Sequence, residues 1–511
     1  MYLVRNILVP IAKKVDLAKA ISNKLKIPEK YIDNIRILRR SIDARKKNNL
    51  KYNFTLVADI DFKIKLDDEI QNFSEPSSYI QSTIKLSNRH PFIIGAGPAG
   101  LFTAISLVEN GFQPYIFDRG ETIDLRAKKV ENFWKNGTLD ENCNVQFGEG
   151  GAGTFSDGKL TSRTKDHYTN RIVDYLIQFG ADESIRYDAL PHLGTDGLRK
   201  IMINLRNFLI EKGCKFFWNS KLENLEINNN KIVSVTINNE RFSPEIMVLG
   251  IGNSARDTFT MLKDKINMEN KSFSVGFRIE HSQDFINRSF YGEKTDLSLT
   301  GPAVYRLTGK YKEKGIYSFC MCPGGYIVAG SSVKNSLVLN GMSYKDRKNN
   351  FANSAIVATV NKKDFGNDIL AGMEFQQKIE SSCFNKSMPY FAPSQTTNDF
   401  MKNSISSNNN LSSYRPGIFQ SDLNQIFTDK ITEAIKSALI KFDKRIPGFV
   451  DSSLLLAPET RTSSPVRLLR EPGTFQANGI VNLFPIGEGS GYAGGIMSSA
   501  ADGFKCGKLF Y

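Results

Sequence analysis

The chain has 511 residues, of which 41% are hydrophobic and 23% are charged. This length and balance are typical of a soluble globular protein with two or three domains. Lys and Arg number 67 against 53 Asp and Glu, a formal net charge of +14, which points to an anionic substrate or a nucleic acid. Because the positive charge is spread along the chain rather than run together, nucleic acid is the less favoured of the two.

Cysteine and histidine usage excludes two further classes of protein. The six cysteines are scattered and only Cys320 and Cys322 are close together, so no disulfide framework is predicted and a reducing, cytoplasmic compartment is indicated. The four histidines lack the paired spacing of metal ligands, and no metal site is predicted. The longest uncharged apolar segment, 92–108, holds three glycines and a proline, so no membrane span is predicted.

Residues 1–88 are predicted to form a small N-terminal α/β domain. A strand-like start, a helical pattern over 15–26 and two strand-rich segments precede a polar stretch at 72–83 that is typical of a linker. The run RRSIDARKK at 39–47 is the densest positive patch. It is interpreted as a solvated strand end or turn, and the alternative is a grip on RNA.

The stretch 92–118 predicts a dinucleotide-binding unit, with an apolar strand at 92–94, a helix and a second strand at 114–117. Gly95 allows the tight turn, Gly97 lets the backbone approach a pyrophosphate, and Gly100 lets the helix pack closely on the strand. The helix N-terminus then offers free N–H groups to the phosphates. Asp118 ends the second strand, where a carboxylate can accept both ribose hydroxyls.

The next segments predict an amphipathic helix over 196–213 and a meander of short strands up to 252. There VLGIGNSA places Gly250, Gly252 and Ala255 in a second glycine pattern after a strand. One interpretation is a strand that re-enters the first nucleotide domain. The other is a second nucleotide fold for NAD(P)H, with Glu280 ending a later strand. Re-entry is favoured, because the meander precedes this strand.

Two more glycine-rich elements indicate a long cofactor. The stretch 146–160 holds four glycines within six residues and predicts a ligand-clamping loop. The stretch 487–496 follows an apolar strand and precedes a small-residue helix. Its small residues let a planar ring pass the backbone, Glu488 can bind a polyol hydroxyl, and the new helix N-terminus can stabilise negative charge on a reduced flavin. Three such elements favour FAD. NAD(P)H is one candidate for a transient electron donor, and the sequence does not name the donor.

The block 269–455 is predicted to be an inserted, β-rich cap or substrate domain with few helices, although 423–443 has the pattern of an amphipathic helix. Cys320 and Cys322 share one face if their segment is extended, with Cα atoms ~6.6–7 Å apart, at or past the disulfide limit. They are interpreted as packed strand cysteines, and a redox dithiol is the alternative. Glu459, Arg461 and Arg467 are predicted either to bind an anionic substrate or to form a surface ion network.

These motifs resemble the superfamily of two-dinucleotide-binding-domain flavoproteins. More narrowly, RRSIDARKK, GEGGAGTFSDGKL, GFRIEH, YSFCMCPGGY and ETRTSSPVR resemble an uncharacterised bacterial family of FAD-dependent dehydrogenases, almost end to end. The resemblance implies adenine contact at the Leu222 backbone, ribityl contact at Gly487 and Glu488, and passage of the flavin ring by 493–496. Asn253 stands where that family often has His. The residues that motif and resemblance together place at the cofactor are Gly95, Gly97, Pro98, Ala99, Gly100, Asp118, Arg119, Arg126, Gly150, Gly151, Gly153, Thr154, Lys159, Leu160, Leu222, Gly250, Gly252, Gly487, Glu488, Ala493, Gly494, Gly495 and Ile496.

The sequence therefore predicts an α/β fold with a Rossmann-like FAD-binding domain (89–268 and 456–511), the inserted cap (269–455) and the N-terminal domain (1–88). The predicted function is that of an FAD-dependent oxidoreductase, a dehydrogenase or reductase, acting on an unidentified small molecule that is anionic if the arginines bind it. The candidate catalytic residues are Cys320, Cys322, Glu459 and Arg461. The alternatives are a flavoprotein that acts on RNA and a flavin-binding protein that serves a partner with little turnover.

Overall fold

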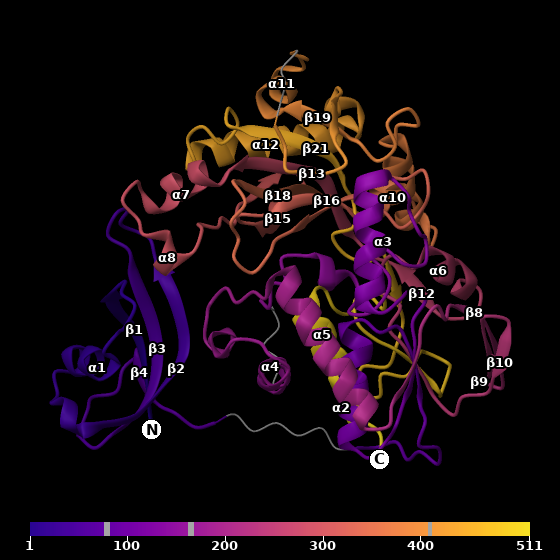
Figure 1. Ribbon diagram of the computed structural model, residues 1–511, viewed down its shortest axis with the longest axis horizontal. Helices are drawn as coiled ribbons and strands as arrows, with labels where there is room; N and C mark the ends of the chain where they lie inside the picture. The colour runs from indigo at the N-terminus through magenta and orange to yellow at the C-terminus, as the bar shows by residue number, and fades with distance from the viewer. Residues whose placement is uncertain (76–81, 162–167, 407–410) are drawn as a thin grey trace.

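The computed structural model describes residues 1–75, 82–161, 168–406 and 411–511. At the N-terminus, four strands form an antiparallel sheet in the order β2-β3-β1-β4, with one helix against it (Figure 1). Its elements are β1 (Tyr2–Pro10), α1 (Leu17–Leu25), β2 (Ile32–Asp43), β3 (Lys51–Ile60) and β4 (Ile70–Asn72). The Asp16 side chain caps α1 by accepting a hydrogen bond from the Lys19 N–H. The predicted small α/β unit is present.

Side-chain and backbone contacts attach this unit to the rest of the chain. Arg40 of β2 forms a two-point ion pair with Asp188, at 2.8 and 3.1 Å, and the Tyr52 hydroxyl donates to the Leu299 carbonyl at 2.8 Å. Most of the predicted linker at 72–83 lies outside the described residues. Just after it, the backbone N–H of Ile84 donates to the Leu509 carbonyl at 2.9 Å, so the chain enters the main body beside the C-terminus.

The main body is built on a five-stranded parallel sheet in the order β23-β11-β5-β6-β7. Its strands are β5 (Phe92–Ile94), β6 (Tyr115–Phe117), β7 (Lys215–Phe217), β11 (Met247–Leu249) and β23 (Leu483–Pro485). Alternate residues enter two different cores, as the period of a strand requires. Ile93 and Val248 pack with helices α2 (Pro98–Glu109), α5 (Gly194–Glu211) and α13 (Ile496–Lys508), whereas Ile94 packs on the opposite face.

That opposite face is covered by the predicted meander. Strands β8 (Leu222–Asn228), β9 (Lys231–Ile237) and β10 (Glu240–Phe242) form a separate three-stranded antiparallel sheet. The flanking strands β7 and β11 were expected in the meander, but they belong to the parallel sheet. Because β11 pairs with both β5 and β23, the predicted re-entry is confirmed. The second nucleotide fold is wrong, since Glu280 lies in an antiparallel strand of another sheet.

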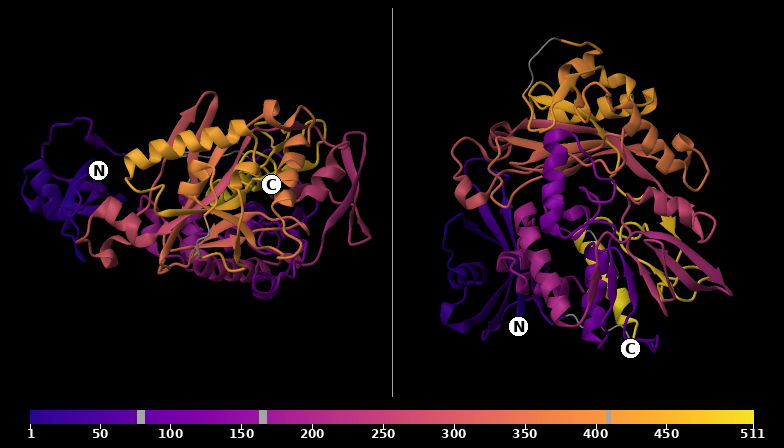
Figure 2. Two further views of the ribbon diagram at one scale, coloured as in Figure 1. Left: turned by 90° about the horizontal axis from the view of Figure 1, so that it is seen from above. Right: turned by 45° about the vertical axis from the view of Figure 1, so that its right-hand side comes forward.

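The third large element is a seven-stranded sheet in the order β14-β15-β18-β13-β21-β19-β20. The strands are β13 (Phe273–Ser282), β14 (Thr308–Tyr311), β15 (Lys314–Cys322), β18 (Phe351–Val360), β19 (Ala392–Thr396), β20 (Ile418–Gln420) and β21 (Ser453–Glu459). Helix α12 (Asp429–Arg445) covers the face turned away from the parallel sheet (Figures 1 and 2). Strand β21 runs across the predicted boundary at residue 455, and the division into domains stays a proposal.

This block holds more helix than its sequence predicts. The pattern over 423–443 corresponds to a 3-10 turn followed by α12, but α10 (Ala371–Ser382) was not expected. Its buried face includes Gln376 and Glu380, which interrupt the apolar stripe that identifies a helix.

The remaining helices and strands of the molecule are α3 (Ile123–Asn136), α4 (Thr169–Gln178), α6 (Arg256–Leu262), α7 (Gln283–Tyr291), α8 (Leu297–Thr300), α9 (Lys362–Phe365), α11 (Thr397–Lys402), β12 (Met268–Asn270), β16 (Tyr326–Ala329), β17 (Leu339–Met342) and β22 (Val466–Leu468).

Candidate functional site

The glycines after β5 lie at the carboxyl edge of the parallel sheet, where open α/β sheets bind ligands. Gly95 has φ +103°, and a Cβ there would lie 2.3 Å from the Gly250 carbonyl oxygen. A Cβ on Gly100 would lie 1.9 Å from the Gly95 oxygen. Gly97 is different, because an added Cβ would meet only the Gly151 Cα, at 3.7 Å. Two glycines are therefore required by packing, and the third keeps space open at the start of α2.

Asp118 and Arg119 follow β6 at the same edge. The Asp118 carboxylate accepts hydrogen bonds from the Ala96 and Gly120 N–H groups, both at 2.8 Å, and so joins the turns after β5 and β6. Arg119 pairs with Asp257 at 2.8 Å and lies over the Phe147 ring, 4.4 Å from its centroid. With Arg119 and another cation beside it, the pKa of Asp257 falls to about 2 despite burial that would raise it.

The glycine-rich loop predicted to clamp a ligand reaches the same place. Gly150 and Gly151 have φ +78° and +63°, a conformation that glycine adopts without strain. The Gly150 N–H donates to the Ala96 carbonyl at 2.8 Å, and a Cβ on Gly153 would lie 2.9 Å from Ile496. Leu160 at the end of the loop is buried in the core.

Arg126 has a structural part in this loop. It is fully buried, and its guanidinium donates to the carbonyls of Asn144, Val145, Gly148 and Glu149. Burial lowers its pKa to about 10. Thr154 is also buried, and its hydroxyl donates to the Glu149 carbonyl at 3.3 Å. These two predicted cofactor residues thus shape the loop from behind.

The C-terminal strip completes the edge. A Cβ on Gly487 would lie 2.7 Å from Ala99, whereas at Gly494 and Gly495 it would meet no atom within 4 Å. The half-buried Glu488 accepts hydrogen bonds from Asn253, at 2.7 Å, and from the Gly495 N–H, at 3.3 Å. Burial raises the pKa of Glu488. Gly252, where a Cβ would also meet nothing, has φ +73° and lies against Gly489.

The arrangement fits an extended dinucleotide. Three glycine-rich segments that are far apart in the sequence meet at one sheet edge, and the space beside Gly97, Gly494 and Gly495 is open. Helices α2 and α13 both have a glycine at the N-cap position and therefore no side-chain cap, which leaves N–H donors for an anion. Residues that would hold FAD are therefore present at the phosphate end and at the flavin end.

Two of the four catalytic candidates belong to separate buried ion pairs. Glu459 lies 3.4 Å from the guanidinium of the fully buried Arg278, and burial raises its pKa while Arg278 opposes the rise. Arg461 binds Glu380 of α10 at 3.0 Å, and Arg256 binds the same carboxylate at 2.9 Å. Glu459 and Arg461 therefore lie in buried ion pairs and not in the expected surface network, and their part in substrate binding stays a prediction.

The two cysteines of β15 do not lie on a regular strand. Cys320 has φ +43°, and Phe319 and Cys322 pair with Ala355 and Asn353, so β15 carries one extra residue as a β-bulge. The extended geometry assumed from the sequence is wrong at this point. Both thiols are free; Cys322 is buried and Cys320 is exposed. Burial raises the pKa of Cys320 to about 12, although Lys159 opposes the rise.

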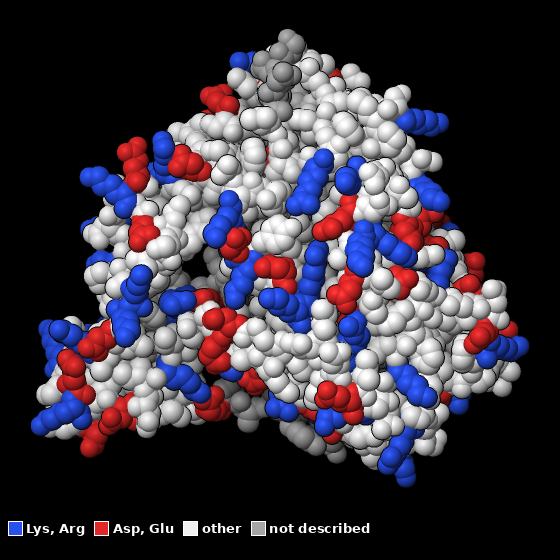
Figure 3. All heavy atoms as spheres, in the orientation of Figure 1, with Lys and Arg blue, Asp and Glu red and all other residues white. Residues whose placement is uncertain are grey.

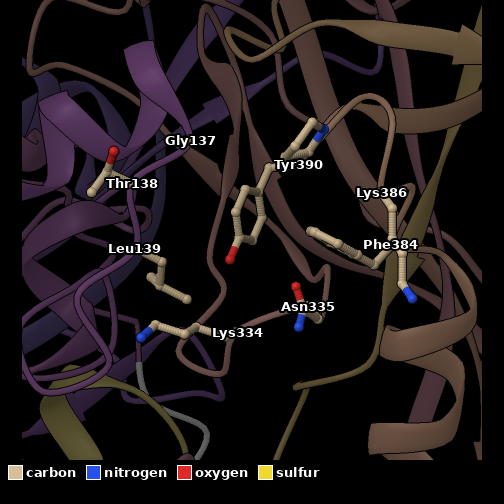
Figure 4. A pocket seen from close by; sticks show the side chains of 9 residues that line it. Gly137, Thr138, Leu139, Lys334, Asn335, Phe384, Lys386 and Tyr390 are labelled. Carbon is tan, nitrogen blue, oxygen red and sulfur yellow. The ribbon is translucent and has the colours of Figure 1, made fainter.

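Other surfaces are less informative about function. A cavity of about 620 Å³ lies between the end of α3 and the loops around Lys334 and Tyr390, and Figure 4 shows the Tyr390 hydroxyl pointing into it. It shares no residue with the glycine-rich edge. In the basic run at 39–47, Arg40 is paired with Asp188 and Arg45 with Asp43. Over the face of the molecule drawn in Figure 3, positive and negative side chains are interspersed.

Two negative findings apply to the part of the chain that the structure describes. There, no group of three or more His, Cys, Asp or Glu side chains could hold a metal ion. Within the same residues, no helix has both the length and the apolar character needed to cross a membrane.

A protein of Clostridium beijerinckii, described only as uncharacterised, is 41% identical over 510 residues, which cover 96% of this chain and 94% of the relative. The chain belongs to the same family as this clostridial protein. Residues 272–462 match a family described as "FAD-dependent protein, C-terminal domain-like", and residues 1–59 match a domain of unknown function. The match over 272–462 supports an FAD-dependent flavoprotein.

Solved structures resemble the chain more distantly. A probable FAD-dependent monooxygenase from Pseudomonas aeruginosa has a TM-score of 0.34 and 10% identity, covering 81% of this chain and 83% of that protein. The tetracycline destructase Tet(55) has a TM-score of 0.33 and 11% identity, covering 82% and 78%. TM-scores this low give no information about the substrate or the reaction of this chain.

Several residues of this region give no signal in the sequence. Asp157, Arg278, Asn353 and Glu380 are all buried polar groups, and each has a partner far along the chain. A buried charge in a strand or helix has no characteristic spacing, so only contacts in space reveal it. The motif GTFSDGKL contains Asp157 and Lys159, but the sequence attributes it to the cofactor alone.

Proposed function

We propose that the protein is an FAD-dependent oxidoreductase acting on a small molecule, with NADH or NADPH as the transient electron donor. One observation carries the proposal: three glycine-rich segments meet at the carboxyl edge of one parallel sheet and leave open space at Gly97, Gly494 and Gly495. When bound, FAD supplies the chemistry of electron and hydride transfer. The chain's residues bind it, orient it and shape the substrate side.

The binding roles follow from position. The α2 N-terminus beside Gly97 would hold the pyrophosphate, and the turn at Asp118 would meet the adenosine ribose. Glu488, held by Asn253, would meet the ribityl chain, and the segment 493–496 would pass the flavin. The loop 148–160 would close over the cofactor, because Gly151 lies against Gly97 and Gly153 against Ile496.

The substrate side is formed by the large sheet. Of the four catalytic candidates, Cys320 is accessible, whereas Cys322, Glu459 and Arg461 are buried or held in ion pairs. We therefore propose Cys320 as the candidate that can touch a substrate. Arg278, which binds the Cys320 carbonyl at 2.8 Å, is proposed as a positioning residue.

Two measurements test this function. Heat release of the cofactor from purified protein, followed by chromatography, should give FAD. Anaerobic addition of NADH or NADPH should then bleach the flavin absorbance with saturable kinetics. FMN, or no flavin after reconstitution, would overturn the cofactor assignment. Flavin that neither nucleotide reduces would remove NAD(P)H as the donor.

A further inference from the structure

A compact charge cluster lies where the loop 148–160 meets the large sheet. Asp157 accepts two hydrogen bonds from the Arg347 guanidinium, at 2.7 and 3.2 Å, and lies 3.4 Å from the Lys159 ammonium. The Lys159 ammonium also donates to the Met321 carbonyl. Arg278 binds the next carbonyl back along the chain, that of Cys320. Lys159 and Arg278 thus bind the carbonyls of two consecutive residues in the bulge of β15.

The carboxylates are shared unevenly among the cations of this cluster. Arg278 pairs with Glu459 at 3.4 Å and also lies near the buried Glu280. Lys159 and Arg347 both pair with the single carboxylate of Asp157. Their charge is therefore only partly compensated, which favours an additional anion.

Lys159 is the member of the cluster that a ligand can reach. Its side chain is 32% exposed, against 10% for Arg347 and 0% for Arg278. Burial would lower the pKa of Lys159, but Asp157 and the nearby cysteines raise it above its usual value, so the ammonium stays protonated. An ammonium has three donors, of which one binds Met321 and a second faces Asp157.

Cys320 lies beside Lys159, because Lys159 binds the carbonyl of the next residue, Met321. The thiol of Cys320 is exposed, and its φ of +43° is a conformation that non-glycine residues adopt at a cost. Asn353 is fully buried and accepts from Arg278 at 2.9 Å, so it supports the cluster from within.

We propose that the surface around Lys159 is an anion subsite, in which the Lys159 ammonium binds a carboxylate or phosphate group of the substrate beside Cys320. The inference rests on the proposed function for the identity of that ligand as a substrate, and it names the substrate class. It also moves the predicted anion site from Arg461 and Arg467 to Lys159, since Arg461 is held by Glu380 and Arg467 by Glu269.

Alkylation of Cys320 in the flavin-loaded protein tests the subsite. The other five cysteines are buried, so the native protein should be labelled at one position. Iodoacetate is an anion and iodoacetamide is neutral, and in both cases the sulfur displaces iodide and its proton goes to solvent. Because both react with the same thiolate, the ratio of their rates cancels the thiol pKa and reports the local positive charge.

The ratio of the iodoacetate rate to the iodoacetamide rate should be at least about fivefold higher in the wild type than in Lys159→Met. This is the effect expected of one nearby, partly screened charge. Lys159→Arg should keep the preference. Lys348→Met is the matched control, because Lys348 is 82% exposed and pairs with Asp346. An unchanged ratio in Lys159→Met, or labelling at another cysteine by mass spectrometry, would overturn the proposal.

Competition identifies the anion. Oxalate and inorganic phosphate should each be added during labelling, and protection of Cys320 by one but not the other names the group that the subsite accepts. Protection by neither contradicts the subsite. Flavin content is measured on the same samples. A charge preference without bound flavin would leave the subsite standing and remove the proposed function, whereas bound flavin without a preference would remove only the subsite.

Discussion

The carboxyl edge of the parallel sheet and the charge cluster at the large sheet differ in the groups that form them. At the sheet edge, glycines bring backbone groups together, as where Gly97 meets Gly151. In the cluster, long charged side chains such as Arg278 hold a strand that departs from regular geometry. The first arrangement suits the proposed cofactor, which is the same in every turnover, and the second suits the proposed anion subsite. The proposed cofactor site is thus formed mainly by backbone groups, and the proposed anion subsite mainly by side chains.

One loop connects the two regions. At one end of the segment 148–160, Gly151 touches Gly97, and at the other end Lys159 reaches Met321 of β15. Between them, Asp157 is tied to Arg347 and to the Ser343 hydroxyl. A change at either end therefore acts on a shared element, and separate perturbations of the two ends show how independent the regions are.

The largest effect is expected at the cofactor edge, from Gly97→Val. Gly97 has φ −80° and ψ −179°, which valine adopts readily, and its Cβ would meet only Gly151 at 3.7 Å. The fold should therefore survive while the pyrophosphate is excluded. We expect flavin content, measured as the ratio of flavin to protein absorbance, to fall by about tenfold or more, since 1.4 kcal/mol of lost binding is already tenfold.

Gly473→Val is the control for this change. Gly473 is exposed, and an added Cβ would meet nothing within 4 Å, so flavin content should not change. Normal flavin occupancy in folded Gly97→Val would show that this glycine has no part in binding the cofactor.

The cluster should respond through stability instead. Arg278→Met leaves Glu459 buried without its ion pair, and breaking a buried pair costs ~3–5 kcal/mol. Urea unfolding should show this loss, and the double variant Arg278→Met/Glu459→Leu should recover much of it. Arg241→Met removes an exposed partner of Glu226 and should cost ~0–1 kcal/mol. Equal losses in Arg278→Met and Arg241→Met would mean that the buried pair is not a specific support.

The same contrast explains what the sequence could predict. The motif at 95–100, the re-entering strand at 247–249 and the strip at 487–496 are contiguous patterns, and each is where the sequence placed it. The pairs Arg278–Glu459 and Asp157–Arg347 join residues 181 and 190 positions apart. Motifs of the sequence include Glu459 and Asp157, but no local pattern shows which residue either of them pairs with. The bulge at Cys320 was also hidden, because YSFCMC has the apolar character of an uninterrupted strand.

A smaller effect is expected in acid, at Glu380. Arg461 and Arg256 lower the pKa of this fully buried carboxylate to about 2, although burial alone would raise it. A folded-state pKa below the unfolded value of about 4.5 contributes stability above that pH, and the contribution is lost as the pH falls from 4.5 toward 2. The wild type should therefore lose up to ~1.4 kcal/mol per pH unit from this group. Glu380→Gln should be less stable at pH 7 but flatter between pH 5 and 3 by urea unfolding. A parallel slope in both proteins would contradict the shift.

The smallest effect concerns the thiols, where we expect no change at all. Cys320 and Cys322 are both free, and Cys322 lies against Arg278, with its Sγ 3.5 Å from Nη2. Burial raises the pKa of both thiols, which disfavours the thiolate that a dithiol–flavin pair needs. Anaerobic dithionite titration should therefore consume two electrons per flavin, without a long-wavelength charge-transfer band, in the wild type and in Cys320→Ser/Cys322→Ser alike. Four electrons in the wild type and two in the double variant would instead make the cysteines a redox pair, and the cluster would then belong to electron transfer as well as to substrate binding.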